Sequence, residues 1–263
     1  MSERSPLKRV CRIALAVILG VGFFAVVMGG AIAAIRLNVS SQPELAWFPL
    51  PVTLLLVASA YLAERYGQIG FAPLSRASLS NTRLWLIAAL ITNAGVMACA
   101  FQGYFTGYVR DAELLSGVDL TFQRTYAIYM SVFAAALAEI SFRGILQTRL
   151  QTILSPWTVI VLIGLLNVFS HRWDTDILQN GIGWFVVLAG WTWLRWLSQS
   201  LWPPLVMHVV INCIVALWIW YVGPIVHASM PGYMVAVVGI VGLVSLGLSA
   251  WLSRGKTVPV VTK

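Results

Sequence analysis

Apolar residues dominate eight long stretches of this chain, and short polar segments separate them. The stretches fall at about residues 10–35, 48–63, 84–103, 125–150, 156–173, 181–197, 203–222 and 231–253. Most of them reach the roughly 20 apolar residues with which a helix crosses the hydrocarbon core of a bilayer. The pattern therefore predicts an all-α fold, a polytopic membrane bundle of about eight transmembrane helices.

The composition excludes an ordinary water-soluble domain. Of the 263 residues, 59% are hydrophobic and 10% are charged, and the mean hydropathy is +0.85. A typical soluble domain has about 25% charged residues. We expect residues 1–263 to form a single integral membrane domain, because eight spans leave little chain for a separate soluble one.

The positive charge of the chain indicates its orientation in the membrane. Seventeen Lys and Arg residues outnumber nine Asp and Glu residues, which gives a formal charge of +8. Twelve of the basic residues fall in segments that lie on the same side of the membrane as the N-terminus, and four fall in segments on the opposite side. Since cytoplasmic loops collect Lys and Arg, this distribution predicts that both termini are cytoplasmic. It also explains the positive charge of the chain, so we expect membrane lipids, and not nucleic acid, as the partner of the basic residues.

Five polar side chains lie within or at the end of the apolar stretches and are candidates for function. They are Glu139, Arg143, His171, His208 and Asn212. An ionisable group near the centre of a bilayer costs about 2.5–3.5 kcal/mol on insertion scales, so such groups mark structural pairs or functional sites.

The spacing of these residues places them in pairs on helix faces. Glu139 and Arg143 are four residues apart, as are His208 and Asn212. Residues four apart share one face of a helix, so an ion pair and an imidazole–carboxamide pair are expected. The alternative is purely structural: the ion pair ties neighbouring helices together, and the histidines serve packing or the membrane interface.

Three separated motifs resemble those of a known family, the CPBP (CAAX protease and bacteriocin-processing, or Abi) intramembrane proteases, which include the CAAX prenyl endopeptidases. The motif EExxxR followed by Gly is similar to residues 138–144, AEISFRG. The motif HxxxN, within a stretch resembling SLWPxxxxH, is similar to residues 200–212. The motif FxxxH matches only at His171, because Asn167 stands where Phe is usual. The motif-bearing core covers about residues 125–215.

The resemblance implies a glutamic-type protease that needs neither a metal nor another cofactor and that cleaves peptide or lipid-modified protein substrates. It implies that a Glu and His171 activate a water molecule, while His208 and Asn212 bind the oxyanion. Arg143 would hold Glu139 charged and oriented. A carboxylate and an imidazole are suited to general-base catalysis, and preorganised donors are suited to a developing oxyanion.

The sequence departs from the family pattern at one important position. The family's water-activating carboxylate is the first Glu of the pair, and Ala138 stands there, while Glu139 matches the second. One residue turns an α-helix by about 100°, so Glu139 does not point where its neighbour points. Three explanations stay open: Glu139 is the base in a shifted geometry, the chain is a non-proteolytic relative, or Ala138 was introduced to inactivate the enzyme.

Other functions for the same residues also stay open. A non-enzymatic membrane protein that recognises peptides would explain the missing Glu. Glu139, His171 and His208 would also serve as three zinc ligands, although no HExxH motif occurs. A transporter would carry inverted repeats or broken helices, and the sequence has neither. The leading hypothesis is a membrane-embedded peptidase, and for it we expect Glu139, His171, His208 and Asn212 to line one polar cavity. We expect the protein to lie in a bacterial inner membrane.

Overall fold

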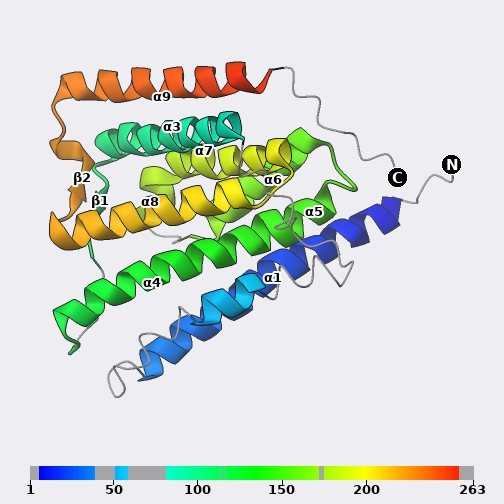
Figure 1. Ribbon diagram of the computed structural model, residues 1–263, viewed down its shortest axis with the longest axis horizontal. Helices are drawn as coiled ribbons and strands as arrows, with labels where there is room; N and C mark the ends of the chain where they lie inside the picture. The colour runs from blue at the N-terminus through cyan, green and yellow to red at the C-terminus, as the bar shows by residue number, and fades with distance from the viewer. Residues whose placement is uncertain are drawn as a thin grey trace. The chain divides into compact units, whose positions relative to one another are not determined.

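The computed structural model describes residues 6–38, 51–58, 81–112, 114–115, 117–171 and 175–254, and this part of the chain is almost entirely helical (Figure 1). Helix occurs in each of the eight apolar stretches. Among the described residues, six helical spans are long and apolar enough to cross a membrane, and a seventh apolar helix, Pro156–Phe169, is shorter. The predicted fold class, a polytopic helical bundle, is confirmed.

The helices are α1 (Pro6–Asn38), α3 (Thr82–Thr106), α4 (Leu120–Ala138), the π-helix η2 (Glu139–Leu146), α5 (Gln147–Leu150), α6 (Pro156–Phe169), α7 (Thr175–Ser198), α8 (Trp202–Tyr221), the 3-10 helix η3 (His227–Ser229) and α9 (Gly232–Ser253). Two short strands, β1 (Val109–Arg110) and β2 (Ile225–Val226), pair antiparallel.

Polar caps and prolines set where the helices begin. The Asn81 side chain accepts a hydrogen bond from the backbone of Leu84 at the start of α3, and the Asp119 side chain accepts two at the start of α4. These caps satisfy amide groups that the first turn leaves without partners. Pro156 is the first residue of α6, where the missing amide hydrogen of proline costs least.

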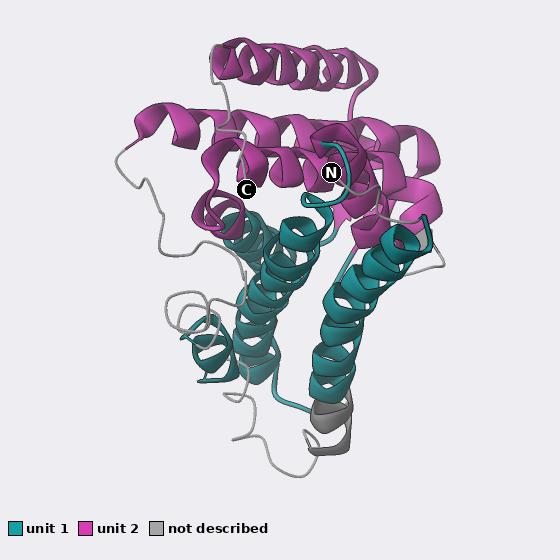
Figure 2. Ribbon diagram, turned by 90° about the vertical axis from the view of Figure 1, so that its right-hand side faces the viewer, with its two compact units in different colours: residues 1–75, 111–155, 208–224 teal, residues 76–110, 156–207, 225–263 magenta. Residues whose placement is uncertain are grey.

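The chain divides into two compact units, which Figure 2 distinguishes by colour. Unit 1 comprises residues 1–75, 111–155 and 208–224, and so contains α1, α4, η2, α5 and most of α8. Unit 2 comprises residues 76–110, 156–207 and 225–263, and contains α3, α6, α7, α9, both strands and the first turns of α8.

Within unit 1, α1 packs closely against the π-helix. A Cβ atom at Gly20 would lie 2.7 Å from Cβ of Leu146 and 3.2 Å from the carbonyl oxygen of Ser141, so only glycine fits there. Phe24 of α1 and Phe142 of η2 lie with their ring centroids 5.3 Å apart. These contacts hold η2 in place along the face of α1.

Within unit 2, small residues and several side-chain hydrogen bonds join α3 to α7. The indole of Trp191 donates to the hydroxyl of Thr92 at 2.9 Å, and both side chains are buried. The backbone of Gly183 approaches that of Cys99 so closely that a Cβ atom at Gly183 would lie 2.5 Å from Cα of Cys99. Small residues permit this kind of backbone approach at membrane helix contacts.

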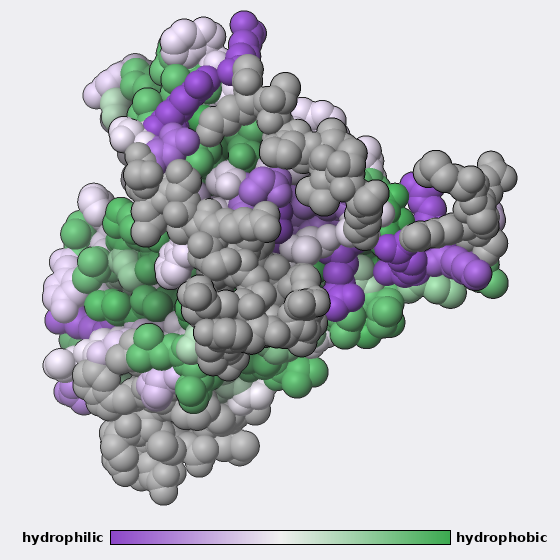
Figure 3. Space-filling view, turned by 45° about the vertical axis from the view of Figure 1, so that its right-hand side comes forward, coloured by the Kyte–Doolittle hydropathy of each residue, from purple (hydrophilic) through white to green (hydrophobic). Residues whose placement is uncertain are grey.

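The described helices expose many large apolar side chains, and Figure 3 shows hydrophobic residues on the surface. On α9, for example, Ile240, Leu243 and Val244 are exposed by more than half. A soluble protein rarely exposes contiguous apolar surface on this scale, whereas a protein surrounded by lipid does. The surface therefore agrees with helices that span a bilayer.

We predict that Gly183→Val destabilises the protein, because the added atoms overlap the backbone of α3. Overpacking of this kind typically costs about 1–3 kcal/mol, which thermal unfolding in detergent would detect as a lower midpoint. The matched control is Gly247→Val in α9, where a Cβ atom meets nothing within 4 Å. Equal midpoints for the two variants would contradict the close packing of α3 on α7.

Candidate functional site

Glu139 lies at the point where a regular helix becomes a π-helix. α4 ends at Ala138, and η2 runs from Glu139 to Leu146, closed by an amide of Gln147 that donates to the carbonyl of Phe142. This bond spans five residues, so the helix holds one extra residue in its turn. Short π-helical segments occur frequently at functional sites, because they redirect the side chains around them.

Glu139 and Arg143 form the ion pair that their spacing predicts. Nη1 of Arg143 donates to Oε1 of Glu139 at 2.7 Å, and neither side chain is exposed. A charged hydrogen bond of this length is stronger than a neutral one. Because both groups are removed from water, neither charge is tolerable without the other.

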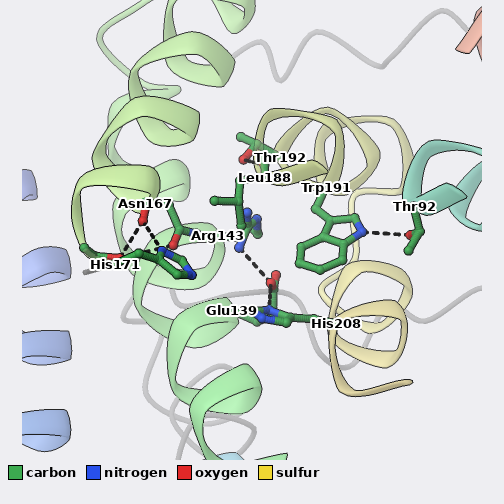
Figure 4. Close-up of polar contacts among 10 residues, drawn as sticks. Thr92, Glu139, Arg143, Asn167, His171, Leu188, Trp191, Thr192 and His208 are labelled. Carbon is green, nitrogen blue, oxygen red and sulfur yellow. Dashed lines mark hydrogen bonds and ion pairs between the residues drawn. The ribbon is translucent and has the colours of Figure 1, made fainter. Parts of the chain in front are cut away.

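His208 completes the cluster from α8. Its Nδ1 lies 2.8 Å from Oε1 of Glu139, the same oxygen that accepts from Arg143, as Figure 4 shows. The imidazole side chain is 10% exposed, while that of Glu139 is fully buried. The second carboxylate oxygen of Glu139, Oε2, has no hydrogen-bond partner among the described residues. The cluster thus joins η2 to α8 inside unit 1.

Asn212 lies one turn beyond His208 on α8. Its Nδ2 donates to the carbonyl oxygen of Ser131 in α4 at 3.5 Å, which is a long and therefore weak hydrogen bond. The carboxamide has two donor hydrogens, so this contact leaves one for another acceptor. Asn212 belongs to unit 1 with Glu139, Arg143 and His208.

His171 belongs to unit 2 and follows the end of α6. Its Nδ1 lies 2.8 Å from the carbonyl oxygen of Asn167, and its ring centroid is 4.4 Å from that of Trp184 in α7 (Figure 4). A carbonyl only accepts, so Nδ1 carries the hydrogen and the neutral ring keeps a lone pair on Nε2. The expectation that His171 shares one cavity with Glu139, His208 and Asn212 stays a prediction.

The structure draws attention to two residues that sequence reasoning did not single out. Trp184 packs on His171, and its position in a tryptophan-rich stretch gives no signal of that contact. Gln147 is fully buried and lies four residues after Arg143, so it continues the polar face of η2 into α5. Its signal in the sequence is the same four-residue spacing that joins Glu139 to Arg143.

The third histidine, His227, is separate from this chemistry. It lies on η3 in unit 2, between α8 and α9, with its ring stacked on Tyr108 at 6.0 Å. Burial lowers the pKa of His227, because desolvation disfavours the charged imidazole. No group of three His, Cys, Asp or Glu side chains that could hold a metal ion occurs within the described residues.

Taken together, these features define an integral membrane protein with a buried carboxylate–guanidinium–imidazole cluster. Residues 121–214 match the family model described as Type II CAAX prenyl endopeptidase Rce1-like. This range contains Glu139, Arg143, His171, His208 and Asn212, and the match confirms the resemblance that the three motifs indicate. It supports a CAAX-type intramembrane endopeptidase in general. Comparisons with curated proteins and with solved structures give no match.

We predict that Arg143→Ala strongly destabilises the protein, because it leaves a carboxylate buried without its charged partner. Breaking a buried ion pair typically costs about 3–5 kcal/mol, which equilibrium unfolding in mixed micelles would measure. Replacing both partners, as Glu139→Leu with Arg143→Leu, should recover most of this loss, since no charge remains buried. A double variant as unstable as Arg143→Ala would show that the ion pair is not the cause.

Proposed function

We propose that this chain is an intramembrane endopeptidase that cleaves peptide bonds in membrane-associated or lipid-modified proteins. The observation that carries the proposal is the cluster of Arg143, Glu139 and His208 in a region that matches a CAAX endopeptidase model. Clusters of buried ionisable groups in contact with one another are frequent at active sites. Within a membrane-spanning segment they mark function by default.

In this proposal water is the nucleophile and no cofactor takes part. A carboxylate–imidazole pair that includes Glu139 activates the water, and the oxyanion is held by a histidine and the carboxamide of Asn212. The four residues of the proposed site are then Glu139, His171, His208 and Asn212, with Arg143 in support. An imidazole and a carboxamide donor are chemically sufficient for the charge that develops on the peptide carbonyl.

The cytoplasmic leaflet is the side from which we expect the substrate to enter. The distribution of Lys and Arg favours cytoplasmic termini, and Arg149, at the end of the span that contains Glu139, is on the same side. Glu139 lies ten residues before Arg149 and nineteen residues after Leu120, so it is in the cytoplasmic half of the span. We propose the inner membrane of a bacterium as the location.

Ala138 favours a second candidate function, a catalytically impaired or non-proteolytic relative that binds peptides within the membrane. The family's first Glu is replaced there, and the Ala138 side chain offers no acceptor for a proton. Such a protein would bind a prenylated peptide without turnover. The two candidates differ in one respect that is simple to measure, the release of a cleaved product.

We predict that the purified chain, reconstituted in lipid vesicles, cleaves a fluorescent prenylated peptide. His208→Ala and His171→Ala should each lower kcat by about 10²- to 10⁴-fold, the usual contribution of acid–base groups. His227→Ala is the matched control and should keep wild-type activity, because His227 lies outside the cluster. If the chain is inert but Ala138→Glu cleaves, the second candidate function holds. If neither chain cleaves, the peptidase assignment is wrong.

We also predict that chelators leave the cleavage rate unchanged. The guanidinium of Arg143 lies 2.7 Å from Oε1 of Glu139 and would repel a divalent cation bound to that oxygen. The measurement is the initial rate with and without a strong zinc chelator after prolonged incubation. Loss of activity that zinc restores would replace this mechanism with a metal-dependent one.

A further inference from the structure

The contacts of His208 suggest how water is activated in a chain that has Ala138 in place of the family's first Glu. Three observations bear on the question: which side chain of the cluster is exposed, which nitrogen of His208 carries a hydrogen, and where the charge resides. All three concern residues within unit 1, whose internal contacts are described.

The exposure of the two side chains favours the imidazole of His208, and not the carboxylate of Glu139, as the group that water contacts. The Glu139 side chain is fully buried, and both neighbours of its Oε1 are side chains of the cluster. The His208 side chain is 10% exposed. A water molecule that approaches this pair from outside the unit therefore meets His208 before it meets Glu139.

The hydrogen bond to Glu139 determines which nitrogen of His208 is protonated. An ionised carboxylate only accepts, so Nδ1 of His208 donates to Oε1. A neutral imidazole that is protonated on Nδ1 has its lone pair on Nε2. In this form Nε2 accepts a proton and cannot donate to an oxyanion.

Arg143 keeps this arrangement fixed. Its guanidinium donates to the same oxygen, so Glu139 remains an anion and an acceptor. The charges of Glu139 and Arg143 cancel, so the carboxylate needs no further positive charge beside it. When the imidazole gains a proton during the reaction, the carboxylate at 2.8 Å stabilises the new positive charge.

We propose that His208 is the general base of this chain and that Glu139 is a positioning residue that acts through His208. The inference rests on the proposed peptidase function. It assigns to a Glu139–His208 dyad the task that the missing carboxylate at position 138 performs in the family. The logic is that of an acid–histidine pair in a serine protease, with water in place of the serine hydroxyl.

The reaction then proceeds in two proton transfers. Nε2 of His208 takes a proton from water as the oxygen forms a bond to the carbonyl carbon, and an oxyanion develops on the carbonyl oxygen. Asn212, one turn further along the same face of α8, donates to that oxyanion. The C–N bond then breaks, and the imidazolium returns the proton to the leaving nitrogen. The products are a new carboxylic acid, which loses its remaining proton to solvent, and a new amine.

The test is a double-variant cycle on the reconstituted full-length chain, using a fluorescent prenylated peptide. We expect His208→Gln to lower kcat by about 10²- to 10⁴-fold with little change in KM. Glu139→Gln should lower kcat to a similar extent, and Glu139→Asp should retain part of it. The double variant should be no worse than His208→Gln alone, because the two residues act as a unit. His227→Gln is the matched control.

A spectroscopic readout separates positioning from a purely structural role. The chain has three histidines, so ¹⁵N signals of its imidazoles are few and can be assigned by single substitutions. We expect His208 to be protonated on Nδ1 and unprotonated on Nε2 in the wild-type chain. Glu139→Gln should weaken this preference, because a neutral carboxamide accepts a hydrogen bond less strongly than a carboxylate, while the signals of His227 stay unchanged.

Different outcomes overturn different claims. If the wild-type chain is inert and Ala138→Glu cleaves, the dyad does not supply a base, although the scaffold is a competent peptidase. If Glu139→Gln abolishes cleavage while His208→Gln keeps most of it, Glu139 acts on water directly and the dyad is wrong. If neither the wild-type chain nor Ala138→Glu cleaves, the peptidase function itself fails. Protonation of His208 on Nε2 alone would also refute the dyad.

Discussion

A carboxylate buried away from water constrains everything around it. Glu139 has no exposed surface, and its charge is tolerable only because Arg143 and His208 both contact Oε1. Arg143 comes from the same helix, but His208 comes from α8, sixty-nine residues further along the chain. The hydrogen bond that Oε1 of Glu139 accepts from His208 therefore joins η2 to α8. The relative position of these two helices determines which chemistry unit 1 can carry out.

The packing of α1 against the π-helix supports this arrangement. η2 begins at Glu139 itself, and the extra residue in its turn changes the direction of the side chains that follow. Gly20 lets α1 approach the backbone of η2, and Phe24 packs on Phe142. A helix that carries function in this unusual form needs packing to hold it, because its backbone geometry is intrinsically less favourable than that of an α-helix.

The sequence predicted the elements well and the site in part. The described part of each apolar stretch contains helix, because length and hydropathy largely decide that a segment becomes a membrane helix. The pair of Glu139 and Arg143 was also predictable, because it depends on four-residue spacing within one helix. The π-helix was not predictable from the sequence, because no residue in EISFRGIL indicates that the helix holds an extra residue per turn. The hydrogen bond between Glu139 and His208 depends on tertiary packing, and the contact of His171 with Trp184 does as well, so neither distance follows from spacing.

The contact between Glu139 and His208 is the claim on which the chemistry rests, and it can be measured without any substrate. Solid-state NMR on the chain in lipid bilayers, labelled with ¹³C in the Glu carboxyl groups and ¹⁵N in the His side chains, reports the proximity of these two groups. A strong dipolar coupling between the Glu139 carboxyl carbon and Nδ1 of His208 is the expected result. A His208 imidazole that shows no coupling to any carboxyl carbon would contradict the account.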